Sequence, residues 1–217
     1  MARAGIRERE KQAAAARARM AKRGKRAKFW KENKKRLTLI TLACIAAAFL
    51  AVFTPLGPDY YYATIQQNKF SSRGQIAPGT FKSLYNLGTF YANTLRKDKA
   101  LECYDEILEG FYNFKAYEFG ENADKSMEKY QASLRDVERG LTSGPPFRVP
   151  DSELPYVGYA IFSAAETMMA KGAARSFPQR LISQVYLNDF YVRFPEACDA
   201  KITDQARKID ERLTGRR

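Results

Sequence analysis

The chain has 217 residues, 45% of them hydrophobic and 28% charged, with a formal net charge of +13 at pH 7. It contains no histidine, which excludes Ser-His-Asp and Cys-His catalysis, histidine metal sites and histidine general bases. It also lacks a glycine-rich phosphate loop of the Walker or Rossmann type. We therefore expect no enzyme activity, no cofactor, no metal and no small-molecule substrate.

The basic charge is concentrated in a first segment, residues 1–36, which holds 15 Lys and Arg against three acids. We interpret this segment as a cytoplasmic arm that lies against anionic lipid, where each basic residue contributes about 1 kcal/mol. The alternative function is a tether that holds ribosomes or nucleic acid at a membrane. The arm has no aromatic residue before Phe29 to stack on bases, so contact with nucleic acid is disfavoured.

Residues 37–56 follow as an uncharged, strongly apolar run directly after Lys34, Lys35 and Arg36. About 20 apolar residues are long enough to cross a bilayer as a helix, and basic flanks stay on the cytoplasmic side. Trp30 before the run and Tyr60, Tyr61 and Tyr62 after it would lie at the two membrane boundaries. We therefore expect a single-pass membrane protein with its amino terminus in the cytoplasm and its carboxy-terminal domain in the periplasm or another extracytoplasmic compartment. A cleaved signal peptide fits less well, because 36 residues make a long charged leader.

A linker rich in proline and glycine is expected over residues 57–79, followed by an all-α domain over residues 80–217. Thr80 is a suitable N-cap for the first helix. Apolar residues recur at helical spacing in two blocks, Phe81–Tyr91 and Ala100–Phe111, and only a few residues separate the blocks. This pattern predicts a helical hairpin.

The hairpin sequence FKSLYNLGTFYANTLRKDKALECYDEILE resembles a tetratricopeptide repeat, a helix–turn–helix unit of 34 residues. The positions that carry the resemblance are Leu84, Leu87, Gly88, Tyr91, Ala100 and Tyr104. Leu95 stands where a turn glycine is usual, and Tyr112 where a closing proline is usual. A helical hairpin of unrelated origin could show the same pattern.

Further helices are expected after the hairpin. Residues 116–141 read as one long helix, and Tyr156–Ala173, with Asp151 or Ser152 as its cap, begins a second hairpin that ends near Pro195. A final helix carries the apolar stripe Ala197 to Leu213. The end of the chain thus resembles the tail of a second repeat, as in envelope repeat proteins, and a short stack of repeats needs a partner to cover its exposed faces.

The family resemblance also implies a partner-binding groove on the first helix of the repeat. By this alignment its residues are Lys82, Tyr85, Thr89, Ala92 and Asn93. They could equally face water or pack under a later helix. Cys103 and Cys198 would share the oxidising side of the membrane, so a disulfide between them stays open. The resulting hypothesis is a membrane-anchored scaffold that binds other membrane or envelope proteins, as a homo- or hetero-oligomer.

Overall fold

The computed structural model describes residues 33–50, 56–70, 75–139 and 149–215. The chain divides into two compact units, residues 1–57 and residues 58–217. The described part of the first unit is one helix over residues 33–50, whose side chains are exposed along almost its whole length. Residues 1–32 of the expected basic arm, Trp30 among them, lie outside the described residues.

The prediction of a membrane-spanning helix over residues 37–56 is wrong. Among the residues that the structure describes, no helix is both long enough and apolar enough to cross a membrane. The described helix over residues 33–50 combines the charged residues Lys34, Lys35 and Arg36 with the apolar residues that follow them. The single-pass topology and the periplasmic placement of the carboxy-terminal domain lose their basis with it.

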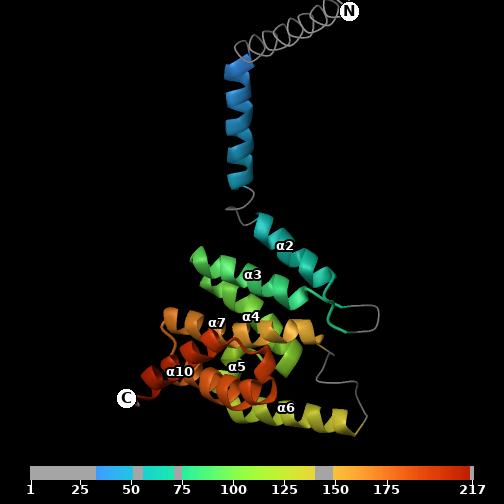
Figure 1. The fold of residues 1–217 in the computed structure, drawn as a ribbon, viewed down its shortest axis with the longest axis vertical. Coiled ribbons are helices and arrows are strands. Elements are labelled where there is room, and N and C mark those ends of the chain that lie inside the picture. Colours follow the sequence, from blue (N-terminus) through green and yellow to red (C-terminus); the bar gives the residue numbers. More distant parts are fainter. Residues whose placement is uncertain (1–32, 51–55, 71–74, 140–148, 216–217) are drawn as a thin grey trace, which may run out of the picture. The chain divides into compact units, whose positions relative to one another are not determined.

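The second unit is built from helices (Figure 1). Its main helices are α2 (Leu56–Gln67), α3 (Thr80–Asn93), α4 (Lys97–Tyr112), α5 (Ala116–Glu121), α6 (Ala123–Glu138), α7 (Leu154–Ala170) and α10 (Ala200–Thr214). Between α7 and α10, a continuous helical stretch consists of α8 (Ser176–Arg180), the π-helix η2 (Leu181–Phe190) and α9 (Tyr191–Arg193). Two short 3₁₀ turns complete the unit, η1 (Asp151–Glu153) and η3 (Pro195–Ala197). The all-α class expected for this part of the chain agrees with these elements.

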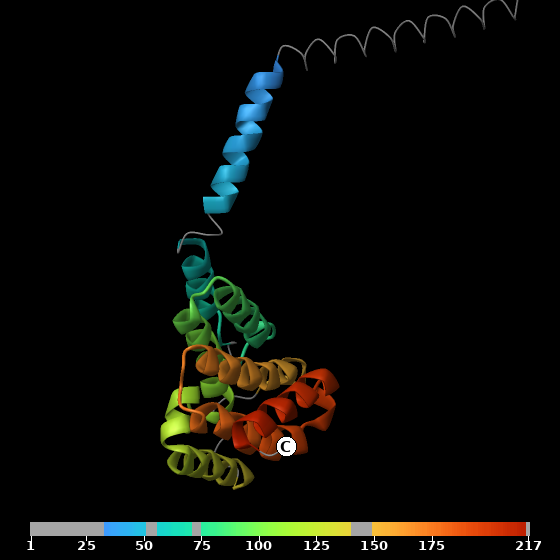
Figure 2. The same ribbon diagram turned by 90° about the vertical axis from the view of Figure 1, so that its left-hand side faces the viewer.

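The helices pack in chain order as two hairpins and a final helix. α3 packs on α4, α7 packs on α4 and α3, η2 packs on α7, and α10 packs on η2. Figures 1 and 2 both show α7 between the α3–α4 hairpin and the carboxy-terminal helices. The first helix of each hairpin, α3 and α7, thereby comes to lie beside the other.

Each hairpin is closed by a glycine on its first helix that contacts an aromatic ring on its second. A Cβ atom at Gly88 would lie 2.6 Å from Cε1 of Tyr104, and one at Gly158 would lie 3.0 Å from Cε1 of Phe190. Real Cβ atoms essentially never come as close as 2.6 Å, so a side chain at Gly88 would force the Tyr104 ring to shift. At Gly158 the contact is tight, and the Phe190 ring would have to move by a few tenths of an ångström.

The stretch expected to be a linker, residues 57–79, packs against the first hairpin. Asp59 of α2 accepts a hydrogen bond of 2.9 Å from the Tyr91 hydroxyl, and Lys69 forms an ion pair with Glu106 of α4. Ile65 and Ile76 are buried in the common core. The compact unit accordingly begins at Pro58 rather than at Thr80.

The long helix expected over residues 116–141 is interrupted in the structure. α5 ends at Glu121, and Asn122 adopts a non-helical conformation (φ −123°, ψ 44°) before α6 begins. Gly120 lies so close to Phe177 that a Cβ atom there would be 3.0 Å from that ring. α5 contacts α8 at this glycine, and α6 extends along the end of the unit farthest from α2 (Figures 1 and 2).

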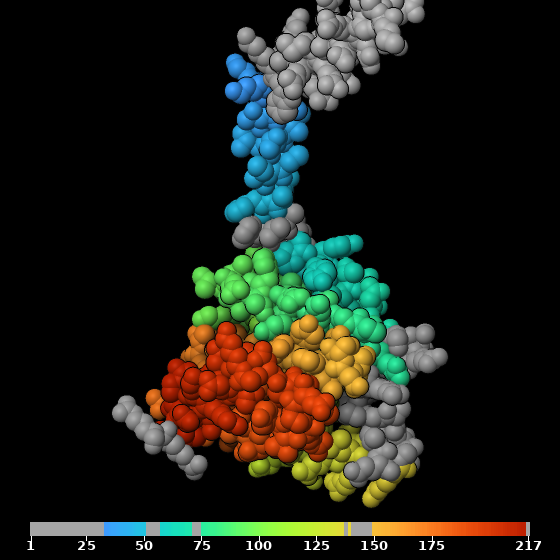
Figure 3. Space-filling view, in the orientation of Figure 1, coloured from blue at the N-terminus to red at the C-terminus, as the bar shows by residue number. Residues whose placement is uncertain are grey.

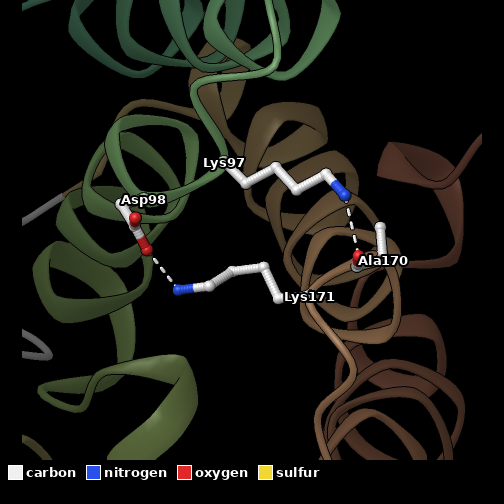
Figure 4. Close-up of polar contacts among 4 residues, drawn as sticks. All are labelled: Lys97, Asp98, Ala170 and Lys171. Atoms are coloured by element: carbon white, nitrogen blue, oxygen red, sulfur yellow. Dashed lines mark hydrogen bonds and ion pairs between the residues drawn. The ribbon is translucent and has the colours of Figure 1, made fainter.

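A crossed pair of lysines joins the two hairpins at the start of α4 and the end of α7 (Figure 4). Lys97 Nζ donates a 2.7 Å hydrogen bond to the carbonyl oxygen of Ala170, and Lys171 donates to the carboxylate of Asp98. The bond to Asp98 is the main cause that raises the pKa of Lys171. A lysine at the carboxy-terminal end of α7 also complements the partial negative charge of that helix end.

Candidate protein-binding groove

The residues that carry the family resemblance all lie inside the first hairpin. The structure buries Leu84, Leu87, Gly88, Tyr91, Ala100 and Tyr104. Burial raises the pKa of the Tyr104 hydroxyl to about 12, and the neighbouring Tyr85 adds to this rise. Tyr104 therefore remains neutral and contacts both α3 and α7.

The five residues expected in the groove share one side of α3. Lys82 and Asn93 are exposed, whereas Tyr85, Thr89 and Ala92 are half-buried. Tyr85 is half-buried because it packs against two tyrosines of α7: its ring centroid lies 6.0 Å from that of Tyr156 and 5.5 Å from that of Tyr159. The expected groove residues thus border α7 rather than standing alone in water.

The sequence-based prediction of the groove did not include Tyr156 and Tyr159, although an internal repeat in the sequence points to them. The spacing Leu84, Leu87, Gly88, Tyr91 of α3 returns in α7 as Leu154, Val157, Gly158, Ile161. Aligning the two glycines places Tyr159 at the position of Thr89, one of the expected groove residues. The internal repetition was hidden because α5, α6 and the segment before η1 separate the two copies.

A hollow lies at the start of α7, and the tyrosines are not among the residues that line it. It has a volume of about 550 Å³ and is lined by Asp151, Leu154, Pro155, Arg193, Phe194, Pro195, Glu196 and Ala197. Pro155 lies one residue before Tyr156 and one helical turn before Tyr159, so the hollow and the tyrosines follow one another along α7. Its size is within the range of about 300–1,000 Å³ that is common for binding pockets.

A second hollow of about 500 Å³ lies farther along α7, between this helix and α10. Phe162 and Ile209 contribute apolar surface to it, and Glu166 and Arg212 are among its charged residues. Burial raises the pKa of Glu166, and the charge of Arg212 opposes that rise. α7 therefore has α3 packed on one side and this hollow with α10 on the other. The start of α7 reaches the surface between α3 and α10 (Figure 3), and we call this surface the groove along α7.

A buried carboxylate holds the two walls of the groove together at one end. Glu153 Oε1 accepts a hydrogen bond of 2.7 Å from the Gly79 N–H, and Oε2 accepts bonds of 2.8 and 3.2 Å from the N–H groups of Phe81 and Lys82. These donors form the amino-terminal end of α3, where a negative charge is favoured. Thr80, the expected N-cap, lies inside the helix, and Gly79 at the cap position offers no side-chain bond.

The cap expected for α7 is also different. Asp151 and Ser152 belong to the 3₁₀ turn η1, and α7 begins without a side-chain cap. Asp151 instead lines the hollow described above. The sequence identified the correct region for the start of this helix but the wrong roles for its polar residues.

The residues assigned to membrane boundaries lose that role with the spanning helix. Lys34, Lys35 and Arg36 are exposed on the helix over residues 33–50, and Tyr60 and Tyr61 are exposed on α2. Tyr62 packs against the first hairpin, where burial and the nearby Glu106 raise its pKa to about 12. Its position is explained by this packing alone.

The cysteines are free thiols in the structure. Cys103 is buried in α4, and burial raises the pKa of its thiol to about 12. Cys198 is half-buried after η3, and its pKa is also raised by burial. Neither thiol has the lowered pKa that makes a cysteine reactive.

Comparison with known proteins adds no assignment to this geometry: the sequence matches no protein-family model, no curated protein and no solved structure.

Proposed function

We propose that the second unit is a protein-binding adaptor of tetratricopeptide-like build, and that its partner occupies the groove along α7. The observation that carries this proposal is the cluster of Tyr85, Tyr156 and Tyr159. These half-exposed rings come from the first helices of both hairpins. Tyrosine is enriched in the energetically dominant centres of protein interfaces.

The repeated spacing of α3 and α7 supports a tetratricopeptide-like build. Leu84 and Leu154, Gly88 and Gly158, and Tyr91 and Ile161 occupy matching places. In both copies the glycine contacts a ring of the following helix. Stacked helical hairpins present their first helices on one extended surface, which such proteins use for binding.

Rigidity of the groove also supports a binding role. Glu153 ties the start of α3 to the start of α7, while Lys97, Asp98 and Lys171 tie α4 to the end of α7. A surface that is already ordered loses less conformational entropy when it binds. The groove can therefore offer its half-exposed rings without first rearranging its walls.

Co-purification from cells that express the full chain tests the proposal. Tyr85→Ala combined with Asn93→Ala removes an aromatic and a polar contact from the groove, so we expect bound proteins to be lost while the helical circular dichroism is retained. Glu109→Ala on the exposed side of α4 is the matched control and should retain them. Equal recovery of bound proteins by the groove variant and the wild type would reject the groove as the binding surface.

A further inference from the structure

The hollow of about 550 Å³ at the start of α7 has a largely apolar lining. Leu154 and Phe194 line it and are half-buried, since both also pack against the hydrophobic core. Pro155, Pro195 and Ala197 complete the apolar part of the lining. Five of the eight lining residues are therefore apolar, and an apolar side chain that enters the hollow is removed from water, which favours binding.

The walls of this hollow are ordered before any ligand enters. Two 3₁₀ turns, η1 and η3, contribute to it, and both pack against α7. Glu153 ties η1 to the start of α3 through its bonds to backbone N–H groups. In η3 the Ala197 N–H donates to the carbonyl oxygen of Phe194 at 3.0 Å, and the Cys198 N–H donates to that of Pro195 at 3.2 Å. Walls that are already held in place lose less conformational entropy on binding.

The charged residues of the lining favour a cation. Asp151 and Glu196 line the hollow and are exposed. Arg193 lines it too, but its Nε pairs with Asp189 at 2.8 Å and its guanidinium donates to the Tyr130 hydroxyl at 2.9 Å. The charge of Asp189 thus offsets that of Arg193. Asp151 and Glu196 therefore give the hollow a net negative charge, which complements a basic ligand.

We propose that the hollow binds an extended segment of a partner protein in which an apolar residue and a basic residue stand two positions apart. A cube of 550 Å³ has an edge of about 8 Å, and side chains two positions apart in an extended segment point to the same side about 7 Å from one another. The apolar side chain lies against Leu154 and Phe194, and the basic side chain pairs with Asp151 or Glu196. This inference rests on the proposed function, in which a partner occupies the groove along α7, and adds the chemistry of that partner.

Binding of synthetic peptides to the purified full chain tests the inference. The probes are four nonapeptide libraries that are random except for a fixed central pattern: Lys-x-Leu-x-Lys, Gln-x-Leu-x-Gln, Glu-x-Leu-x-Glu or Lys-x-Ser-x-Lys. The patterns are symmetric, so either direction of the peptide presents the same pair of side chains. We expect the lysine–leucine library to be enriched over the other three. The tightest peptide from it, and the same peptide with glutamine in place of both lysines, are then measured by fluorescence anisotropy.

The variants separate the charge of the hollow from its apolar space. Asp151→Asn combined with Glu196→Gln removes both charges at exposed positions, so it should weaken the lysine peptide at least fivefold and leave the glutamine peptide within twofold of the wild type. Ala197→Leu fills apolar space and should weaken both peptides at least fivefold. Glu109→Gln, which removes an exposed charge from α4, is the matched control and should stay within twofold for both. Retained helical circular dichroism shows that each variant is folded.

Equal enrichment of the lysine–leucine library and any of the other three would overturn the inference. So would a lysine peptide that binds the Asp151→Asn, Glu196→Gln variant or Ala197→Leu as tightly as it binds the wild type. These results are distinct from failure of the adaptor function itself. If Tyr85→Ala with Asn93→Ala still abolishes co-purification while the four libraries bind equally, the groove binds a protein but the hollow does not select this pattern.

Discussion

The buried carboxylate of Glu153 should contribute strongly to stability, because it satisfies three backbone donors at the start of α3. The side chain is only 3% exposed, and its acceptor bonds measure 2.7, 2.8 and 3.2 Å. Hydrogen bonds to a charged group contribute about 1.5–3 kcal/mol each. Counting only the two shorter bonds at the low end of this range, we expect Glu153→Ala to lower the free energy of unfolding by about 3 kcal/mol.

Glu153→Gln should have a smaller effect, about 1–2 kcal/mol, because one oxygen can still accept while the amide group faces N–H donors. The free energy of unfolding is measured by urea denaturation of the full chain, followed by far-ultraviolet circular dichroism. Glu109→Gln, on the exposed side of α4, is the control and should remain within about 0.5 kcal/mol of the wild type. A Glu153→Ala variant as stable as this control would show that the carboxylate does not hold α3 and α7 together.

Three further changes test separate parts of the fold. Leu95 has a left-handed conformation (φ 61°) and is 83% exposed, so Leu95→Gly should raise the free energy of unfolding by about 0.5–1 kcal/mol. Asn113→Gly, at φ 59°, should raise the free energy of unfolding by less, because asparagine tolerates the left-handed region. A Leu95→Gly variant less stable than the wild type would refute backbone strain at Leu95. Gly88→Ala should lower the free energy of unfolding by about 1–3 kcal/mol, because the new Cβ would collide with Tyr104. Thermal denaturation measures this loss, and an unchanged midpoint would contradict the close contact between Gly88 and Tyr104. Burial raises the pKa of Asp105 to about 6, above the value of about 3.9 in an unfolded chain. Ionisation of Asp105 should therefore lower the free energy of unfolding by up to about 2 kcal/mol as the pH rises from 4 to 6. Asp105→Asn should lose this part of the pH dependence, and a pH dependence identical to that of the wild type would disprove the role of Asp105.

Local patterns were sufficient to locate the first hairpin. The spacing of Leu84, Leu87 and Tyr91 repeats with the helical period, and these residues are buried in the structure. The match of Gly88 to Tyr104 depends on the sizes of two side chains at a helix crossing, which the sequence displays directly. Such information is local, so a single sequence contains it.

Interactions between distant segments could not be read in this way. Glu153 reaches donors that lie 71 to 74 residues earlier in the chain, and no spacing rule relates a carboxylate at the start of one helix to the start of another. The sequence instead favoured Thr80, the nearest suitable cap. Tyr159 was missed for a related reason, because its counterpart in α3 is separated from it by the α5–α6 insertion.

The prediction of a membrane-spanning helix rested on composition. The run from Leu37 is apolar, but among the described residues no helix is both long enough and apolar enough to cross a membrane. Asp59 and Tyr62 beyond the run pack with the first hairpin. Apolar composition alone therefore does not establish a membrane-spanning helix.

Site-specific photo-crosslinking in cells tests most directly whether the groove along α7 binds a protein. A photoreactive residue replaces Thr89 of the groove in one full-length variant and Glu118 of α5, outside the groove, in another. We expect a discrete crosslinked product, heavier than the chain, from position 89 and not from position 118, and we expect this product to disappear when Tyr159→Leu is added. A product of equal yield from both positions, or one that persists with Tyr159→Leu, would contradict this expectation.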